Sequence, residues 1–86
     1  MAIPPHISKN HIFQIINQID NGRSIERKRL ARKVALRYNE NNYPVKILIS
    51  WANELAVGKE FQSKLFVTQE ASRYLTELGF EIINIE

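Results

Sequence analysis

Apolar residues near the start of the chain recur with the period of an α-helix. They stand at Ile12, Ile15, Ile16 and Ile19. This i, i+3, i+4, i+7 spacing places them on one face of a helix. Ser8 lies just before this segment and is a preferred N-cap residue, and Asn21-Gly22 follows it. Because glycine readily adopts the left-handed conformation that ends many helices, the pattern predicts a first helix between Ser8 and Gly22.

The next segment allows two interpretations. In "KVALRY", residues 33–38, Val34, Leu36 and Tyr38 alternate with more polar neighbours, which is typical of a half-buried strand. Because the "NENN" run at 39–42 supplies turn residues, we predict a short hairpin with strands near 33–38 and 42–43. The competing prediction is a helix over 25–37, because "ERKRLARKVALRY" also has high helix propensity.

The second half of the chain predicts two helices and a strand. Pro44 suits the first turn of a helix that Gly58 ends. Its expected buried positions are Val45, Leu48, Ile49, Ala52, Leu55 and Ala56. Thr68 is the expected cap of a third helix, which Gly79 ends and whose inward positions are Ala71, Leu75 and Leu78. Residues 80–85, "FEIINI", read as a closing strand.

These elements predict one α+β domain over residues 1–86, with three helices and a small antiparallel sheet, in a winged-helix-like arrangement. The chain has no cysteine, which excludes disulfides and thiol nucleophiles. Neither a signal peptide nor a membrane-spanning run is apparent, so we expect a soluble cytoplasmic protein with no membrane partner.

Few residues suggest catalysis. His6 and His11 lack a third metal ligand nearby, and a surface or capping role is expected for His11. The sequence contains no Gly-rich phosphate loop and no metalloprotease motif. We therefore expect a non-enzyme without cofactor or metal. Trp51 and Tyr74, like Phe61 and Phe66 beside a loop, are expected to pack in or near the core rather than to stack on bases.

Positive charge is concentrated in one segment. Between residues 23 and 37 the chain carries seven cations and one acid, a net charge of +6 within a total of +3, so the remainder sums to −3. The seven are Arg23, Arg27, Lys28, Arg29, Arg32, Lys33 and Arg37. We call residues 23–37 the basic segment. Such a localised charge indicates an anionic partner, with DNA as the leading candidate. The alternative is a solvated basic face on a protein-interaction or structural domain.

The basic segment is followed, after the predicted turn, by a helix start that carries polar and aromatic residues. Lys46 lies in the first turn of that helix, where the positive helix end favours an anion. Arginine binds phosphate through paired, charge-assisted hydrogen bonds. The expected DNA-contacting set is Arg29, Arg32, Lys33, Arg37, Tyr43, Pro44, Lys46 and Ile47.

Several short motifs resemble the small N-terminal head and sulfur-binding domains of modification-dependent (type IV) restriction endonucleases. The resemblance spans about residues 7–83 and starts with "HIFQIINQID". Its other elements are Leu36-x-Tyr38-Asn39, Tyr43-Pro44-x-Lys46, an apolar helix with Ala52, a loop Phe66, and Leu75-x-x-Leu78-Gly79-Phe80-Glu81-Ile82. The resemblance implies a DNA-reading domain that travels with a nuclease or motor domain in a larger protein.

The resemblance also implies a specific ligand. In the sulfur-binding members, an apolar cavity receives the sulfur of a phosphorothioate linkage. In this sequence, the matching positions of the cavity wall are Tyr43 and Pro44, with Ile47 at the position of a small residue. The upstream basic residue would be Arg32 or Lys33. An apolar wall suits sulfur, because removing a sulfur atom from water costs less free energy than removing an oxygen atom. Ile47 is larger than the family's alanine, which would narrow such a cavity.

Overall fold

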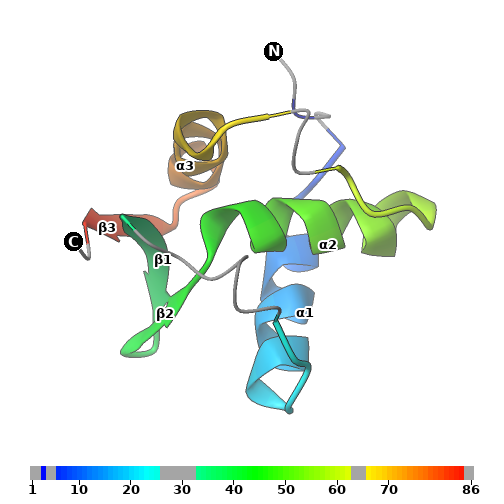
Figure 1. Cartoon of the computed structure of the whole chain (residues 1–86), viewed down its shortest axis with the longest axis horizontal. Coiled ribbons are helices and arrows are strands. Elements are labelled where there is room, and N and C mark those ends of the chain that lie inside the picture. Colours follow the sequence, from blue (N-terminus) through cyan, green and yellow to red (C-terminus); the bar gives the residue numbers. More distant parts are fainter. Residues whose placement is uncertain (1–2, 4–5, 26–32, 63–65, 85–86) are drawn as a thin grey trace.

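The computed structural model describes residues 3, 6–25, 33–62 and 66–84 of the chain. Within these ranges it contains three α-helices and a three-stranded antiparallel sheet, in the predicted order along the chain (Figure 1). The helices are α1 (Lys9–Asp20), α2 (Val45–Val57) and α3 (Thr68–Glu77), and the strands are β1 (Val34–Tyr38), β2 (Asn41–Tyr43) and β3 (Glu81–Asn84). The α+β prediction is therefore confirmed, and the winged-helix likeness stays a prediction.

Helix α1 begins and ends where the sequence places it. Ser8 Oγ accepts a hydrogen bond from the His11 backbone N–H at 3.4 Å, and His11 Nδ1 accepts one from the Ser8 N–H at 3.0 Å. This reciprocal cap satisfies two backbone donors and gives His11 its predicted capping role. Asn21 caps the other end, and Gly22 follows with φ of 109°.

The hairpin prediction is confirmed by the pairing of β1 with β2. Leu36 lies opposite Tyr43, and Tyr38 lies opposite Asn41. The competing helix over 25–37 is wrong for residues 34–37, which are strand, and 26–32 lie outside the described residues. The two turn residues, Asn39 and Glu40, have positive φ of 51° and 68°, as in a type I′ turn. That conformation costs a residue with a Cβ about 1 kcal/mol.

Helix α2 is the central element, and it differs from the predicted buried stripe. Its first seven residues are buried on nearly all sides except at Lys46, because α1, α3 and the sheet surround it. Leu55 is 39% exposed and Ala56 is half-buried, so the last turn of the predicted stripe is wrong. Figure 1 shows the reason, since the C-terminal end of α2 extends past α1. Trp51, at 5% exposure, packs in the core as expected.

Helix α3 starts one residue away from the prediction. Val67 is the N-cap residue and Thr68 is already helical, so the expected Thr68 cap is wrong. The Glu70 carboxylate instead accepts a hydrogen bond from the Val67 N–H at 3.1 Å. At the other end Gly79 has φ of 102°, and buried Phe80 donates its N–H to the Leu75 carbonyl at 3.1 Å. That end matches the prediction.

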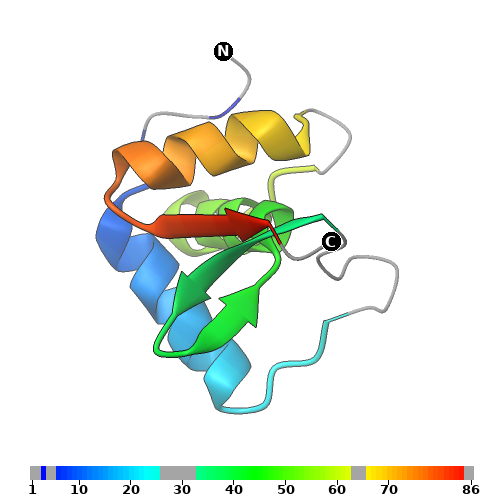
Figure 2. The same cartoon turned by 90° about the vertical axis from the view of Figure 1, so that its left-hand side faces the viewer.

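The helices cover one face of the sheet, whose strand order is β2-β1-β3 (Figure 2). Leu36, completely buried, points to the helices together with its cross-strand neighbours Tyr43 and Ile82. Because side chains alternate along a strand, Arg37 and its neighbours Asn42 and Glu81 lie on the opposite face. No described helix crosses that face in Figure 2, and we call it the open face.

Candidate nucleic-acid interface

The structure separates the predicted contact residues into three groups. Lys33 and Arg37 are exposed, Lys46 is half-buried, and the apolar members are buried. The buried members are Tyr43, Pro44 and Ile47. Arg29 and Arg32 lie outside the described residues. The described members of the predicted set therefore do not form one exposed surface, since Lys33 and Arg37 are exposed while Tyr43, Pro44 and Ile47 are buried.

The exposed cations lie along β1. Lys33 immediately precedes the strand and Arg37 is four residues further, which corresponds to about 13 Å of extended chain. Arg37 stands on the open face between Asn42 of β2 and Glu81 of β3. Ala35, between the two cations, is completely buried, so the exposed part of this face lies toward the β1–β2 turn. A guanidinium there can reach a phosphate in solvent without opening the core.

Tyr43 has a structural role that local sequence did not reveal. Its ring is 2% exposed, and its hydroxyl donates a 2.6 Å hydrogen bond to a carboxylate oxygen of Asp20 at the end of α1. Burial, followed by the hydrogen bond to Asp20, raises the pKa of Tyr43 to about 12. The residue therefore fastens the hairpin to α1.

The expected apolar wall for a phosphorothioate sulfur stays a prediction, and the structure places its residues in the core. Tyr43 is 2% exposed, Ile47 is 1% exposed, and Pro44 is buried as the N-cap residue of α2. Their apolar surface is already removed from water by the core, so a sulfur atom would contact them only after displacing side chains.

Lys46 occupies the first turn of α2, as predicted, but its ammonium group is engaged. Lys46 Nζ lies 5.0 Å from the centre of the buried Phe66 ring. This is a cation–π distance, and the contact holds the loop before α3 against α2. Pro44 offers no side-chain cap, and the first turn of α2 contains no acidic residue that would interact with the positive helix end.

Arg23, counted in the basic segment, serves the fold. Its guanidinium lies 3.7 Å from the centre of the Trp51 ring, and its Nη2 donates to Glu54 at 3.1 Å. Its Nη1 donates to Gln18. The guanidinium thus bridges the C-terminal end of α1 and α2. The sequence offered no local signal for this, because Trp51 and Glu54 are about thirty residues away.

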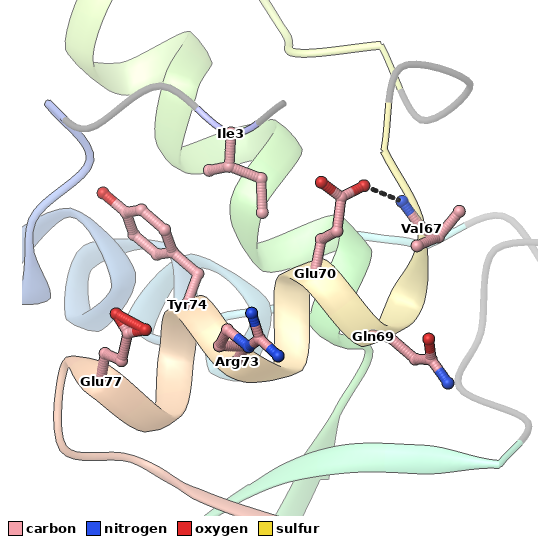
Figure 3. A pocket seen from close by; sticks show the side chains of 7 residues that line it. All are labelled: Ile3, Val67, Gln69, Glu70, Arg73, Tyr74 and Glu77. Carbon is pink, nitrogen blue, oxygen red and sulfur yellow. Dashed lines mark hydrogen bonds between the residues drawn. The ribbon is translucent and has the colours of Figure 1, made fainter. Parts of the chain in front are cut away.

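A groove of about 200 Å³ lies along α3 beneath the N-terminal segment (Figure 3). Its polar groups hold the fold, since Tyr74 donates to the Ile7 carbonyl at 2.6 Å and Glu70 caps α3. Glu77 is seven residues from Glu70, or about 10.5 Å along the helix, so the two carboxylates do not converge. Among the described residues, no three His, Cys, Asp or Glu side chains gather as a metal site.

None of the helices found in the described ranges has the length and apolar character needed to cross a bilayer. Comparisons of the chain with protein-family models, with curated proteins and with solved structures found no significant match. The candidate interface is therefore defined by its own geometry, with Arg37 on the exposed part of the open face and Lys33 exposed just before β1, the last two cations of the basic segment.

Proposed function

We propose that this domain binds the sugar–phosphate backbone of duplex DNA through the cations of the basic segment other than Arg23, among them Lys33 just before β1 and Arg37 on β1. The observation that carries the proposal is that Lys33 and Arg37, the last two cations of a segment of net charge +6, are both exposed. The motif resemblance supports the proposal that this domain is the DNA-reading part of a larger restriction or defence protein, which also contains a nuclease or motor domain.

Backbone binding has a measurable electrostatic signature. Each phosphate that a cation neutralises releases counterions, which contributes about −0.9 to the slope of log affinity against log salt. Replacing Lys33 and Arg37 by alanine should therefore reduce the magnitude of that slope by about 1.8. Between 50 and 200 mM salt, this corresponds to about a 12-fold smaller loss of affinity.

The test is fluorescence anisotropy with labelled duplexes over a salt series, comparing the native chain with Lys33→Ala/Arg37→Ala. Lys59→Ala is the matched control, because Lys59 is an exposed lysine after the far end of α2. We expect the double variant to lose affinity on every duplex and the control to match the native chain. Absence of binding to any duplex at low salt would refute the proposal.

Modification reading is tested by the same titrations with unmodified, methylated and phosphorothioate duplexes of one sequence. Because Tyr43, Pro44 and Ile47 are buried, we expect no preference for the phosphorothioate. A clear preference would show that the core near β2 opens on binding.

The second candidate function is binding to a protein. It is favoured by the mixed charge of the open face, where Glu81 stands beside Arg37. Glu81→Gln separates the two candidates, because removing an acid beside a phosphate contact should strengthen DNA binding a few-fold. A protein partner that pairs with both charges should bind this variant more weakly.

A further inference from the structure

The tip of the β1–β2 hairpin carries polar side chains that the fold leaves unused. Asn39, Glu40 and Asn42 are exposed, and within the part of the chain that the structure describes their side chains make no hydrogen bond or ion pair. The turn lies at the end of the hairpin farthest from α3 and at the lower left in Figure 1. These groups are therefore free to meet a partner.

Glu40 is an unfavourable choice for this turn on structural grounds alone. Its φ of 68° lies in the left-handed region, where glycine and asparagine are the residues without strong steric penalty. Glutamate at this position places a carboxylate at the tip of the hairpin, although its backbone is strained there. A strained residue that no hydrogen bond or ion pair among the described residues explains points to a use outside the fold.

The hairpin is held firmly behind this tip. On β2, Tyr43 is anchored to Asp20, and on β1 the Tyr38 ring lies 5.3 Å from the Phe13 ring of α1. Both strands are thus fastened to α1 within a few residues of the turn. A fixed tip loses little conformational entropy on binding, which favours selective contacts.

The chemistry of the tip suits base edges rather than phosphates. A carboxylate accepts hydrogen bonds and is repelled by phosphate, so in a duplex its natural partner is an exocyclic amino group, above all cytosine N4 in the major groove. The Asn42 amide can both donate and accept, which matches adenine N6 and N7. The major groove is wide enough for a two-stranded ribbon.

Resting on the proposed DNA binding, we propose that the β1–β2 turn enters the major groove and reads sequence. Glu40 accepts a hydrogen bond from a cytosine amino group and Asn42 contacts the adjacent base edge, while Arg37, beside Asn42 on the open face, holds a phosphate. Glu40 also discriminates by repulsion, because any register that brings its carboxylate against the backbone is penalised.

The test is selection from a random duplex library, followed by anisotropy on the enriched sequence and on versions with single base-pair changes. The variants are Glu40→Gly and Asn42→Ala, with Lys59→Ala as control. Glycine suits the turn better than glutamate, so Glu40→Gly should fold at least as stably as the native chain. Thermal unfolding of each variant checks this.

We expect the native chain to enrich a motif with a C·G pair, and Glu40→Gly to lose about tenfold in discrimination at that pair. Because the variant also lacks a charge that phosphate repels, its affinity for duplexes without the C·G pair should stay the same or rise. Asn42→Ala should relax a neighbouring position. Binding without sequence enrichment, or an unchanged motif in both variants, would overturn base reading and leave backbone binding intact. Failure to bind any duplex would instead overturn the proposed function itself.

Discussion

The hydrogen bond between Tyr43 and Asp20 gives the sharpest test of the packing described above. Tyr43→Phe removes only the hydroxyl, which donates to the Asp20 carboxylate at 2.6 Å and leaves the buried ring in place. A hydrogen bond to a charged group contributes about 1.5–3 kcal/mol to stability. Because Asp20 is exposed and its carboxylate would regain water, we expect the lower end, about 1.5 kcal/mol. For a domain of this size, that corresponds to a fall in Tm of about 6–12 °C.

The assay is urea unfolding followed by the fluorescence of Trp51, the one tryptophan of the chain. Asp20→Ala and the double variant complete a thermodynamic cycle. If the two groups stabilise the fold through their mutual contact, the double variant should lose little more than either single variant. Additive losses, or a Tyr43→Phe change below about 0.5 kcal/mol, would refute this assignment of the bond.

The same bond has a consequence at alkaline pH. The pKa of Tyr43 is about 12 in the fold against an ordinary value of 10.0, so the folded state holds the proton more tightly than the unfolded state. Its contribution is complete below pH 10 and is lost as the pH rises from 10 through 12. Tyr43→Phe lacks this titration, so the stability difference between the two proteins should shrink over that interval. A constant difference would contradict the raised pKa. Burial also raises the pKa of Tyr74, but both proteins share that residue.

Two further substitutions separate fold from function. Arg23→Ala removes the stack on Trp51 and the pair with Glu54, so thermal unfolding should show a loss of about 1–2 kcal/mol, while the salt slope of DNA binding stays unchanged. A reduced slope would place Arg23 in the interface. Ser50→Ala removes a completely buried hydroxyl that has no hydrogen-bond partner among the described residues, so urea unfolding should show unchanged or slightly raised stability. A loss above about 1 kcal/mol would reveal a hydrogen bond to that hydroxyl.

Local signals in the sequence predicted the elements well. The Ser8 cap, the isoleucine period of α1 and the glycines that end α2 and α3 each act within one helical turn, so the sequence displays them directly. The same holds for the hairpin, because the alternation of residues 34–38 depends only on which face is buried.

The surroundings of the candidate site were harder to predict, because they depend on contacts between distant segments. From the sequence, Tyr43 could contact a ligand at a helix start. In the structure its hydroxyl is bound to Asp20, which lies 23 residues earlier in the chain. The sequence placed Arg23 in a charged surface, but in the structure its guanidinium stacks on the ring of Trp51. Leu55 followed the helical period, but the period cannot show where α2 leaves the core. Each error arose where burial is decided by tertiary packing rather than by neighbours in sequence.

Contacts with aromatic rings set three of the described cations apart from Lys33 and Arg37. Lys9, Arg23 and Lys46 each lie over a ring, so their charge is partly balanced within the fold and their stems cover apolar surface. The rings are Phe13 and Phe80 for Lys9 (5.9 and 5.8 Å), Trp51 for Arg23 (3.7 Å) and Phe66 for Lys46 (5.0 Å). Lys33 and Arg37 have no ring contact within the described ranges. If Lys9, Arg23 or Lys46 left its ring to bind a phosphate, apolar surface would become exposed to water and the fold would lose stability. Charge removal should therefore lower stability at Lys9, Arg23 and Lys46 and lower DNA affinity at Lys33 and Arg37, so a ring contact is a physical reason to exclude a cation from the interface.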